Sequence, residues 1–211
     1  YLPKQVPVTE LPEERMQFTL GMYGEGDFYT MKGVVEEFFE KAGLSGKETY
    51  DPESGKPFLH PGRQANIIYD GKTVGYLGEL HPQVADNYSI KGRAYVAVID
   101  MPEIVALADF GRKYEGIAKF PAVSRDISMV MKKSILVGEV EKIFDAKGGQ
   151  YLESYELFDI YEGAQIKAGY KSVAYSLTFR AKDKTLEEAD YAPAMEKILK
   201  ALEELGIELR K

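Results

Sequence analysis

Two histidines and one glutamate have side chains of types that bind metal ions. His60 and His81 each precede a proline, and Glu79 comes two residues before the second histidine. Imidazole and carboxylate groups together can hold zinc. The spacing is uninformative without a matching loop, so a second interpretation is preferred. In it, each histidine sits in a turn and bonds to nearby backbone.

Two glycine-containing stretches fall short of the motifs that bind phosphate. Gly71-Lys72-Thr73 matches the end of a P-loop, but Asn66 stands where that motif requires its first glycine. Gly24 and Gly26 supply only two of the three glycines of a dinucleotide fingerprint. Asp70-Gly71 is better explained as the turn of a β-hairpin, because this dipeptide favours the backbone angles of a two-residue hairpin loop.

The composition excludes several classes of protein. The 211 residues include no cysteine, which rules out disulfides, iron–sulfur clusters, thiolate zinc sites and cysteine nucleophiles. The 34 acidic and 27 basic residues give a net charge of −7, which argues against non-specific coating of nucleic acid. No apolar run approaches the roughly 20 residues that span a bilayer, and the first residues do not resemble a signal peptide. We expect a cytoplasmic protein with neither DNA nor membrane as a partner. Because the chain starts with Tyr1, we also expect a piece of a longer protein.

The first half of the sequence predicts an α+β layer with a mostly antiparallel sheet. Asp27 is expected to cap a helix that ends at Gly43, and the turn residues between Gly55 and Gly62 indicate a loop. The expected inward face of that helix comprises Phe28, Met31, Val35, Phe38 and Ala42. The other expected elements are strands at 15–22, 65–69, 73–77 and 94–99 and short helices at 82–88 and 102–108.

The second half predicts the order βαββαβ, which is the ferredoxin-like arrangement. Its strands are expected at 126–131, 152–161, 171–180 and 207–210, with a helix at 137–146. A second helix should follow a capping box from Thr185 to Glu188, although Pro193 favours a start nearer Asp190. Its expected buried stripe comprises Met195, Ile198, Leu199, Leu202 and Leu205. Glycines and a proline between 109 and 121 indicate a boundary, which divides the chain into domains 1–114 and 115–211.

In a ferredoxin-like domain both helices cover one face of the sheet and leave the other open. Alternation along the strands predicts that Ser128 and Arg210 lie on the open face and that Phe158 and Ile160 point into the core. It also places Tyr155, Leu157, Asp159, Tyr161, Ser172, Ser176, Thr178 and Arg180 on the open face. Such a surface suits unstacked RNA bases, because tyrosine can stack on a base while polar groups read its edges. An ordinary solvated sheet face would show the same alternation.

Several ordered motifs carry a resemblance to a known family. The second half resembles the ferredoxin-fold anticodon-binding domain that ends the β subunit of bacterial phenylalanyl-tRNA synthetase, through KFPAVSRD (119–126), LFDIY (157–161) and KSVAYSLTFR (171–180). The first half resembles the module that precedes it, through DFYTMKG (27–33), HPGR (60–63) and GYLGELHP (75–82). This preceding module is a catalytically silent copy of the class II synthetase fold.

The resemblance implies a role in tRNA recognition and subunit scaffolding. The family enzyme is an α2β2 heterotetramer that joins phenylalanine to tRNA(Phe) with ATP and magnesium, and its active site belongs to the α subunit. The chain alone is therefore expected to be inactive and to hold no cofactor or metal. Positions that match the family's anticodon contacts are Ser128, Asp159, Tyr161 and Ser172, with Arg210 a looser match. Ser128 stands where the family can have alanine, so that contact can differ in detail.

One alternative remains for the βαββαβ half. A ferredoxin-like regulatory module that binds a small ligand, such as an amino acid, would have the same order of elements. It would not explain the ordered motifs of the first half.

Overall fold

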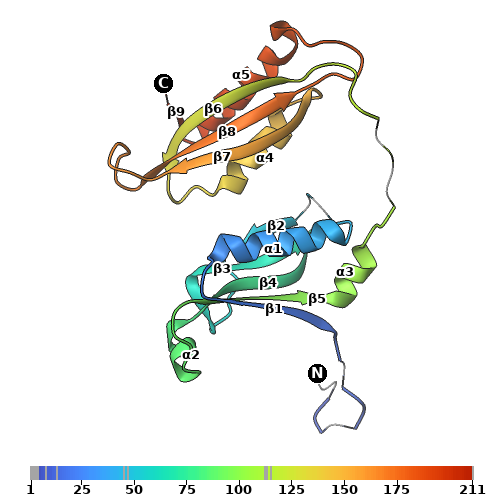
Figure 1. Ribbon diagram of the computed structural model, residues 1–211, viewed down its shortest axis with the longest axis vertical. Coiled ribbons are helices and arrows are strands. Elements are labelled where there is room, and N and C mark those ends of the chain that lie inside the picture. Colours follow the sequence, from blue (N-terminus) through green and yellow to red (C-terminus); the bar gives the residue numbers. More distant parts are fainter. Residues whose placement is uncertain are drawn as a thin grey trace. The chain divides into compact units, whose positions relative to one another are not determined.

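The chain forms two compact units, Tyr1–Lys113 and Tyr114–Lys211. The computed structural model in Figure 1 describes residues 5–7, 9–12, 14–44, 46, 48–111, 114 and 116–210. Residues 112, 113 and 115, in the stretch where the sequence predicts a boundary, lie outside the described residues. No helix among those described is long and apolar enough to cross a membrane.

The first unit is a five-stranded sheet with the strand order β1-β5-β4-β3-β2, in which every neighbouring pair is antiparallel. Helix α1 packs on one face of this sheet (Figure 1). The elements are β1 (Gln17–Tyr23), α1 (Phe28–Lys41), β2 (Glu48–Asp51), β3 (Leu59–Tyr69), β4 (Lys72–Leu80), α2 (Pro82–Asn87), β5 (Ala94–Asp100) and α3 (Met101–Leu107).

Helix α1 begins at the predicted cap. The Asp27 carboxylate accepts a hydrogen bond from the Thr30 backbone N–H at 2.8 Å, and the Thr30 hydroxyl accepts one from the Asp27 N–H at 3.2 Å. The Thr30 N–H and the Thr30 hydroxyl, which donates to the same carboxylate at 2.9 Å, favour its ionised form and lower the pKa of Asp27. The helix buries Met31 and Val35 as predicted, but its third buried residue is Phe39, whereas Phe38 is only partly buried.

The loop predicted across Gly55–Gly62 is wrong at its end, because β3 already begins at Leu59. Pro61 is tolerated there because the register with β4 shifts between Leu59 and Gln64, so its missing N–H costs no regular ladder bond. Strand β2 was not predicted, since its four residues, ETYD, form no apolar run. The β3–β4 hairpin is confirmed, and Asp70 and Gly71 both have the positive φ (49° and 75°) that its turn requires.

Gly43 follows α1 with φ of +76°, and a β-carbon there would lie 1.8 Å from the Asp109 carbonyl oxygen. We expect Gly43→Ala to destabilise the first unit by more than about 1–2 kcal/mol, since the left-handed region alone costs that much for a residue with a β-carbon. Gly33, in the middle of α1, has nothing within 4 Å of its β-carbon position. Gly33→Ala should therefore stabilise the unit by about 0.5–1 kcal/mol. Urea unfolding measures both, and shifts of the same sign would contradict this account.

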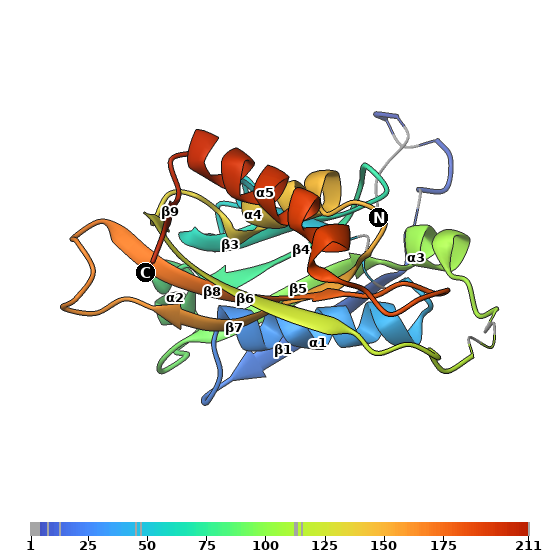
Figure 2. The ribbon, with the colours of Figure 1, turned by 90° about the horizontal axis from the view of Figure 1, so that it is seen from above.

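The second unit has the predicted βαββαβ order. Its strands pair as β7-β8-β6-β9, all antiparallel, and α4 and α5 pack on one face (Figure 2). Among the described residues of this unit, no helix or strand covers the opposite face. The elements are β6 (Val123–Lys132), α4 (Val137–Lys147), β7 (Leu152–Tyr161), β8 (Tyr170–Phe179), α5 (Glu188–Glu204) and β9 (Glu208–Leu209).

Aromatic rings form the centre of the second core. The Phe144 ring of α4 is fully buried, and its centroid lies 5.0 Å from that of Tyr175 and 5.2 Å from that of Tyr155. The Tyr175 hydroxyl donates to Glu141 at 2.8 Å, and the Tyr155 hydroxyl donates to Asp145 at 3.0 Å. Burial, together with these acceptors, raises the pKa of both tyrosines, so both are neutral donors that link the sheet to α4.

The start and the end of α5 correct two expectations. Its capping box is formed by Glu187 and Asp190, rather than by Thr185 and Glu188, and the Glu187 N–H donates to the Asp190 carboxylate at 2.9 Å. Pro193 lies inside the helix. Leu205 was expected to be buried but is 40% exposed, because the helix ends at Glu204 and Leu205 is its C-cap.

Candidate nucleic-acid interface

Two neighbouring rows of residues cross the open face of the second sheet. In the first row, Asp159 pairs with Ala174, and Ala174 pairs with Ser128. The Arg210 backbone N–H extends this row by donating to the Ser128 carbonyl oxygen at 2.8 Å. Directly opposed residues of antiparallel strands point to the same face. Asp159, Ser128 and Arg210 therefore share the open face.

The second row lies two residues further along the same strands. Tyr161 pairs with Ser172, Ser172 with Val130, and Val130 with Glu208. The five predicted site residues thus fall in two adjacent rows, although they come from three different strands and from the residue that follows β9, and span more than 80 positions of the sequence. The register brings all five together.

The five side chains differ in how much of them solvent reaches. Asp159 and Arg210 are exposed, Ser128 is partly exposed, and Tyr161 is 39% exposed. Ser172 corrects an expectation, because it was placed on the exposed surface and is 3% exposed. Its side chain is short and stands on the central strand β8 between the larger Tyr161 and Val130. Ser172 therefore forms the floor of the space between Tyr161 and Val130 and does not project from the face.

A β-bulge in β7 makes the predicted alternation wrong on part of that strand. Leu157 pairs with Tyr175 and Asp159 with Ala174, so Phe158 is an extra residue without a partner. An extra residue reverses which side chains point inward. Before the bulge, Tyr155 and Leu157 pack against the helix-covered core, although they were expected on the open face.

Phe158 and Ile160 were expected in the core and are instead 56% and 49% exposed. Asp159 and Tyr161 nevertheless lie on the open face as predicted, because they follow the bulge. Phe158 is an exposed aromatic residue beside Asp159 that the sequence reasoning missed. Strict alternation cannot reveal a bulge, so nothing in the strand pattern marks it.

The open face carries more carboxylates than cations near the two rows. Asp126 and Glu156 both pair with Ser176 in the next row, while Asp159 and Glu208 lie within the two rows. A phosphate backbone is poorly accommodated over this many carboxylates. The edges of bases fit this face better than phosphates do, because carboxylate and hydroxyl oxygens accept hydrogen bonds from amino groups of bases.

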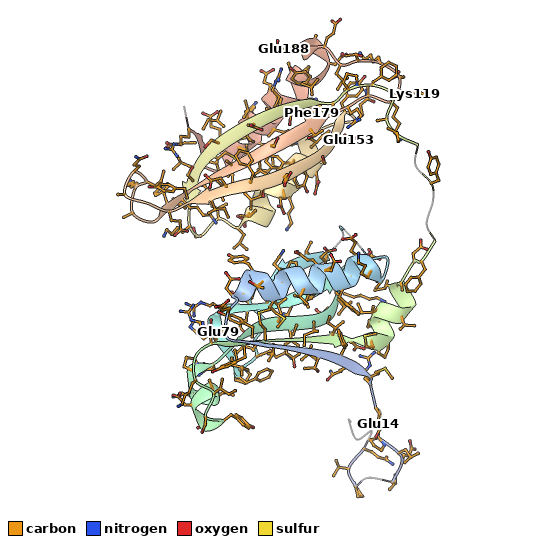
Figure 3. All side chains as sticks on the ribbon, in the orientation of Figure 1. Glu14, Glu79, Lys119, Glu153, Phe179 and Glu188 are labelled. Carbon is orange, nitrogen blue, oxygen red and sulfur yellow. The ribbon has the colours of Figure 1, made fainter. Side chains whose placement is uncertain are left out.

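In the first unit, Glu79 and the two histidines each contact other groups of the protein. Glu79, labelled in Figure 3, accepts hydrogen bonds from the Arg63 guanidinium at 3.2 Å, and Arg93 approaches it at 3.9 Å. His60 Nδ1 accepts from the Gly62 N–H, and His81 Nδ1 accepts from the Gln83 N–H. Both histidines thus bond to nearby backbone, but His60 lies within β3 and His81 caps α2. Within the described part of the chain, no three His, Cys, Asp or Glu side chains gather closely enough to hold a metal ion.

Comparison with protein families places both units. Residues 118–210 match the model of the ferredoxin-fold anticodon binding domain, and residues 1–101 match the phenylalanyl tRNA synthetase beta chain CLM domain. The two matches together cover nearly the whole chain. They do not favour the alternative of a small-ligand regulatory module, because that alternative would leave the match of residues 1–101 unexplained.

Curated relatives agree with these models. The chain is 45% identical to the phenylalanine–tRNA ligase beta subunit of Clostridium acetobutylicum over 202 residues, which is 95% of this chain and 25% of the relative. It is 41% identical to the beta subunit of Clostridium tetani over 211 residues, which is 100% of this chain and 26% of the relative. For Moorella thermoacetica the identity is 39% over 89% of the chain and 23% of the relative. The chain therefore spans about a quarter of the length of the relatives that it matches, and it belongs to the family of phenylalanyl-tRNA synthetase beta chains.

Proposed function

We propose that the second unit binds the anticodon of tRNA(Phe) through the open face of its sheet, as part of a phenylalanine–tRNA ligase. One observation carries this proposal. The five residues that match the family's anticodon contacts lie in two adjacent rows on the sheet face that no described helix or strand of this unit covers. The match of residues 118–210 to an anticodon binding domain supports it.

Each side chain has a role suited to its chemistry. Tyr161 offers an aromatic face for stacking on a base. The Asp159 carboxylate accepts hydrogen bonds from base amino or imino groups, and Arg210 donates to base oxygens and ring nitrogens. Ser128 can donate or accept with its hydroxyl. Ser172, at the floor between Tyr161 and Val130, contacts a base that enters between them.

The proposal also assigns roles to the first unit and to the α subunit of the ligase. We infer that the first unit is a non-catalytic scaffold, and that phenylalanine activation takes place on the α subunit of an α2β2 heterotetramer that uses ATP and magnesium. The described residues of this chain contain no cluster of ligands fit for a metal ion. Neither glycine stretch matches a phosphate-binding motif. In this proposal the chain contributes RNA binding and assembly, and the chemical step belongs to the α subunit.

Binding of two RNA hairpins to the 211-residue chain tests the proposal. One hairpin is the anticodon stem-loop of tRNA(Phe), and the other has the same stem and loop length with a scrambled anticodon. We expect the first to bind more tightly by at least the 1–3 kcal/mol that a single mismatched base contact is worth. The dependence of affinity on salt should be shallow, since the acidic face admits few phosphate contacts.

Equal affinity for the two hairpins would contradict anticodon reading by this face. A steep loss of affinity for both hairpins with added salt would point instead to general phosphate binding elsewhere on the chain.

A further inference from the structure

The loop that joins β7 to β8, residues 162–169, meets the Tyr161 side chain at Gly163. A β-carbon built on Gly163 would lie 2.0 Å from the Tyr161 hydroxyl oxygen, 2.2 Å from Cζ and 2.8 Å from Cε1. All three distances are shorter than any real carbon contact. The end of the Tyr161 ring thus occupies the space that a side chain at position 163 would need.

The same loop is held by one hydrogen bond within it and by several contacts with its surroundings. The Ile166 N–H donates to the Gly163 carbonyl oxygen at 2.9 Å, and the Lys133 N–H donates to the Gly169 carbonyl oxygen at 2.9 Å. Glu162 forms an ion pair with the Lys133 side chain. Gln165 accepts a hydrogen bond from the Arg210 guanidinium at 3.5 Å, so the loop also contacts a second residue of the proposed site.

We propose that Gly163 is a positioning residue for anticodon binding. Because it lacks a side chain, the anchored loop can close against the Tyr161 ring and hold the ring in the orientation that stacks on a base. This inference rests on the proposed function, since it assigns to Gly163 an effect that acts through Tyr161 alone.

The energetics separate positioning from folding. An added methyl group at 163 meets the far end of a flexible side chain rather than backbone. The cheapest response is rotation of the Tyr161 ring, because the loop is held by its hydrogen bonds. Gly163→Ala should therefore leave the unit folded with a displaced ring.

A double-mutant cycle with the anticodon stem-loop tests the inference on the 211-residue chain. Tyr161→Ala, Gly163→Ala and the double variant are compared with the unchanged chain. We expect Gly163→Ala to weaken binding by a factor approaching that of Tyr161→Ala, which is roughly 5- to 150-fold. The double variant should bind no more weakly than Tyr161→Ala. Gly138→Ala, in α4, is the matched control because nothing lies within 4 Å of its β-carbon position, and it should bind normally.

The outcomes separate this inference from the proposed function. If Tyr161→Ala weakens binding and Gly163→Ala does not, the inference is overturned and the proposed function stands. If the two effects add in the double variant, Gly163 acts by another route and the inference is again overturned. If Tyr161→Ala itself binds normally, stacking by Tyr161 fails and the inference fails with it.

A measurement without any substitution covers the case in which Gly163→Ala misfolds. In the unchanged chain, nuclear Overhauser contacts between the Tyr161 ring protons and the Gly163 α-protons are expected. Their absence would overturn the inference.

Discussion

Tyr161→Ala is expected to reduce the affinity of the chain for the tRNA(Phe) anticodon stem-loop by about 1–3 kcal/mol, the usual value of one stacked base. The ring is 39% exposed on the open sheet face, in the row that it shares with Ser172, Val130 and Glu208. Removal of the ring takes away the stacking surface and leaves the sheet register unchanged. Titration calorimetry or fluorescence anisotropy with labelled RNA measures the loss.

Two lysines provide the matched controls for this experiment. Lys197 and Lys200 are exposed on α5, which packs on the opposite face of the sheet. Lys197→Ala and Lys200→Ala should change the affinity little, although each removes a positive charge. If Tyr161→Ala behaves like Lys197→Ala, the open face does not read the anticodon.

Phe144→Ala is expected to destabilise the second unit by about 3–5 kcal/mol, the range for truncating a fully buried phenylalanine. The ring contacts Tyr155 and Tyr175 from α4 and is 0% exposed, so its removal leaves a cavity between helix and sheet. For a unit of this size, such a loss lowers the melting temperature by more than about 10 °C. Hydrogen exchange followed by mass spectrometry measures the loss of stability separately on peptides from each unit.

The first unit serves as the internal control. Because the two cores share no residues, Phe144→Ala should leave exchange in the first unit unchanged. Phe39→Ala, which removes a fully buried ring from the first core, should produce the reverse pattern. Loss of protection in both units from either substitution would mean that they unfold as one.

The sequence by itself determined most of the elements and the membership of the candidate site. Asp27 marked the start of α1 because its carboxylate bonds to the N–H of Thr30, three positions away. Asp70-Gly71 marked the hairpin because both residues tolerate positive φ. The βαββαβ order followed from strand and helix periodicity, and the five site residues followed from resemblance. All of these signals are local or are motifs that remain in order along the chain.

The tertiary structure alone decided which of those residues meet and how far each is exposed. The bulge at Phe158 reverses the alternation of β7, and no pattern in LFDIY reveals it, because the extra residue is defined by pairing with β8. Ser172 is buried because of its neighbours on two other strands. The contact of Gly163 with the Tyr161 ring likewise depends on how the loop closes. Register and loop closure are set by contacts between distant segments, and such contacts leave no periodic trace in the sequence.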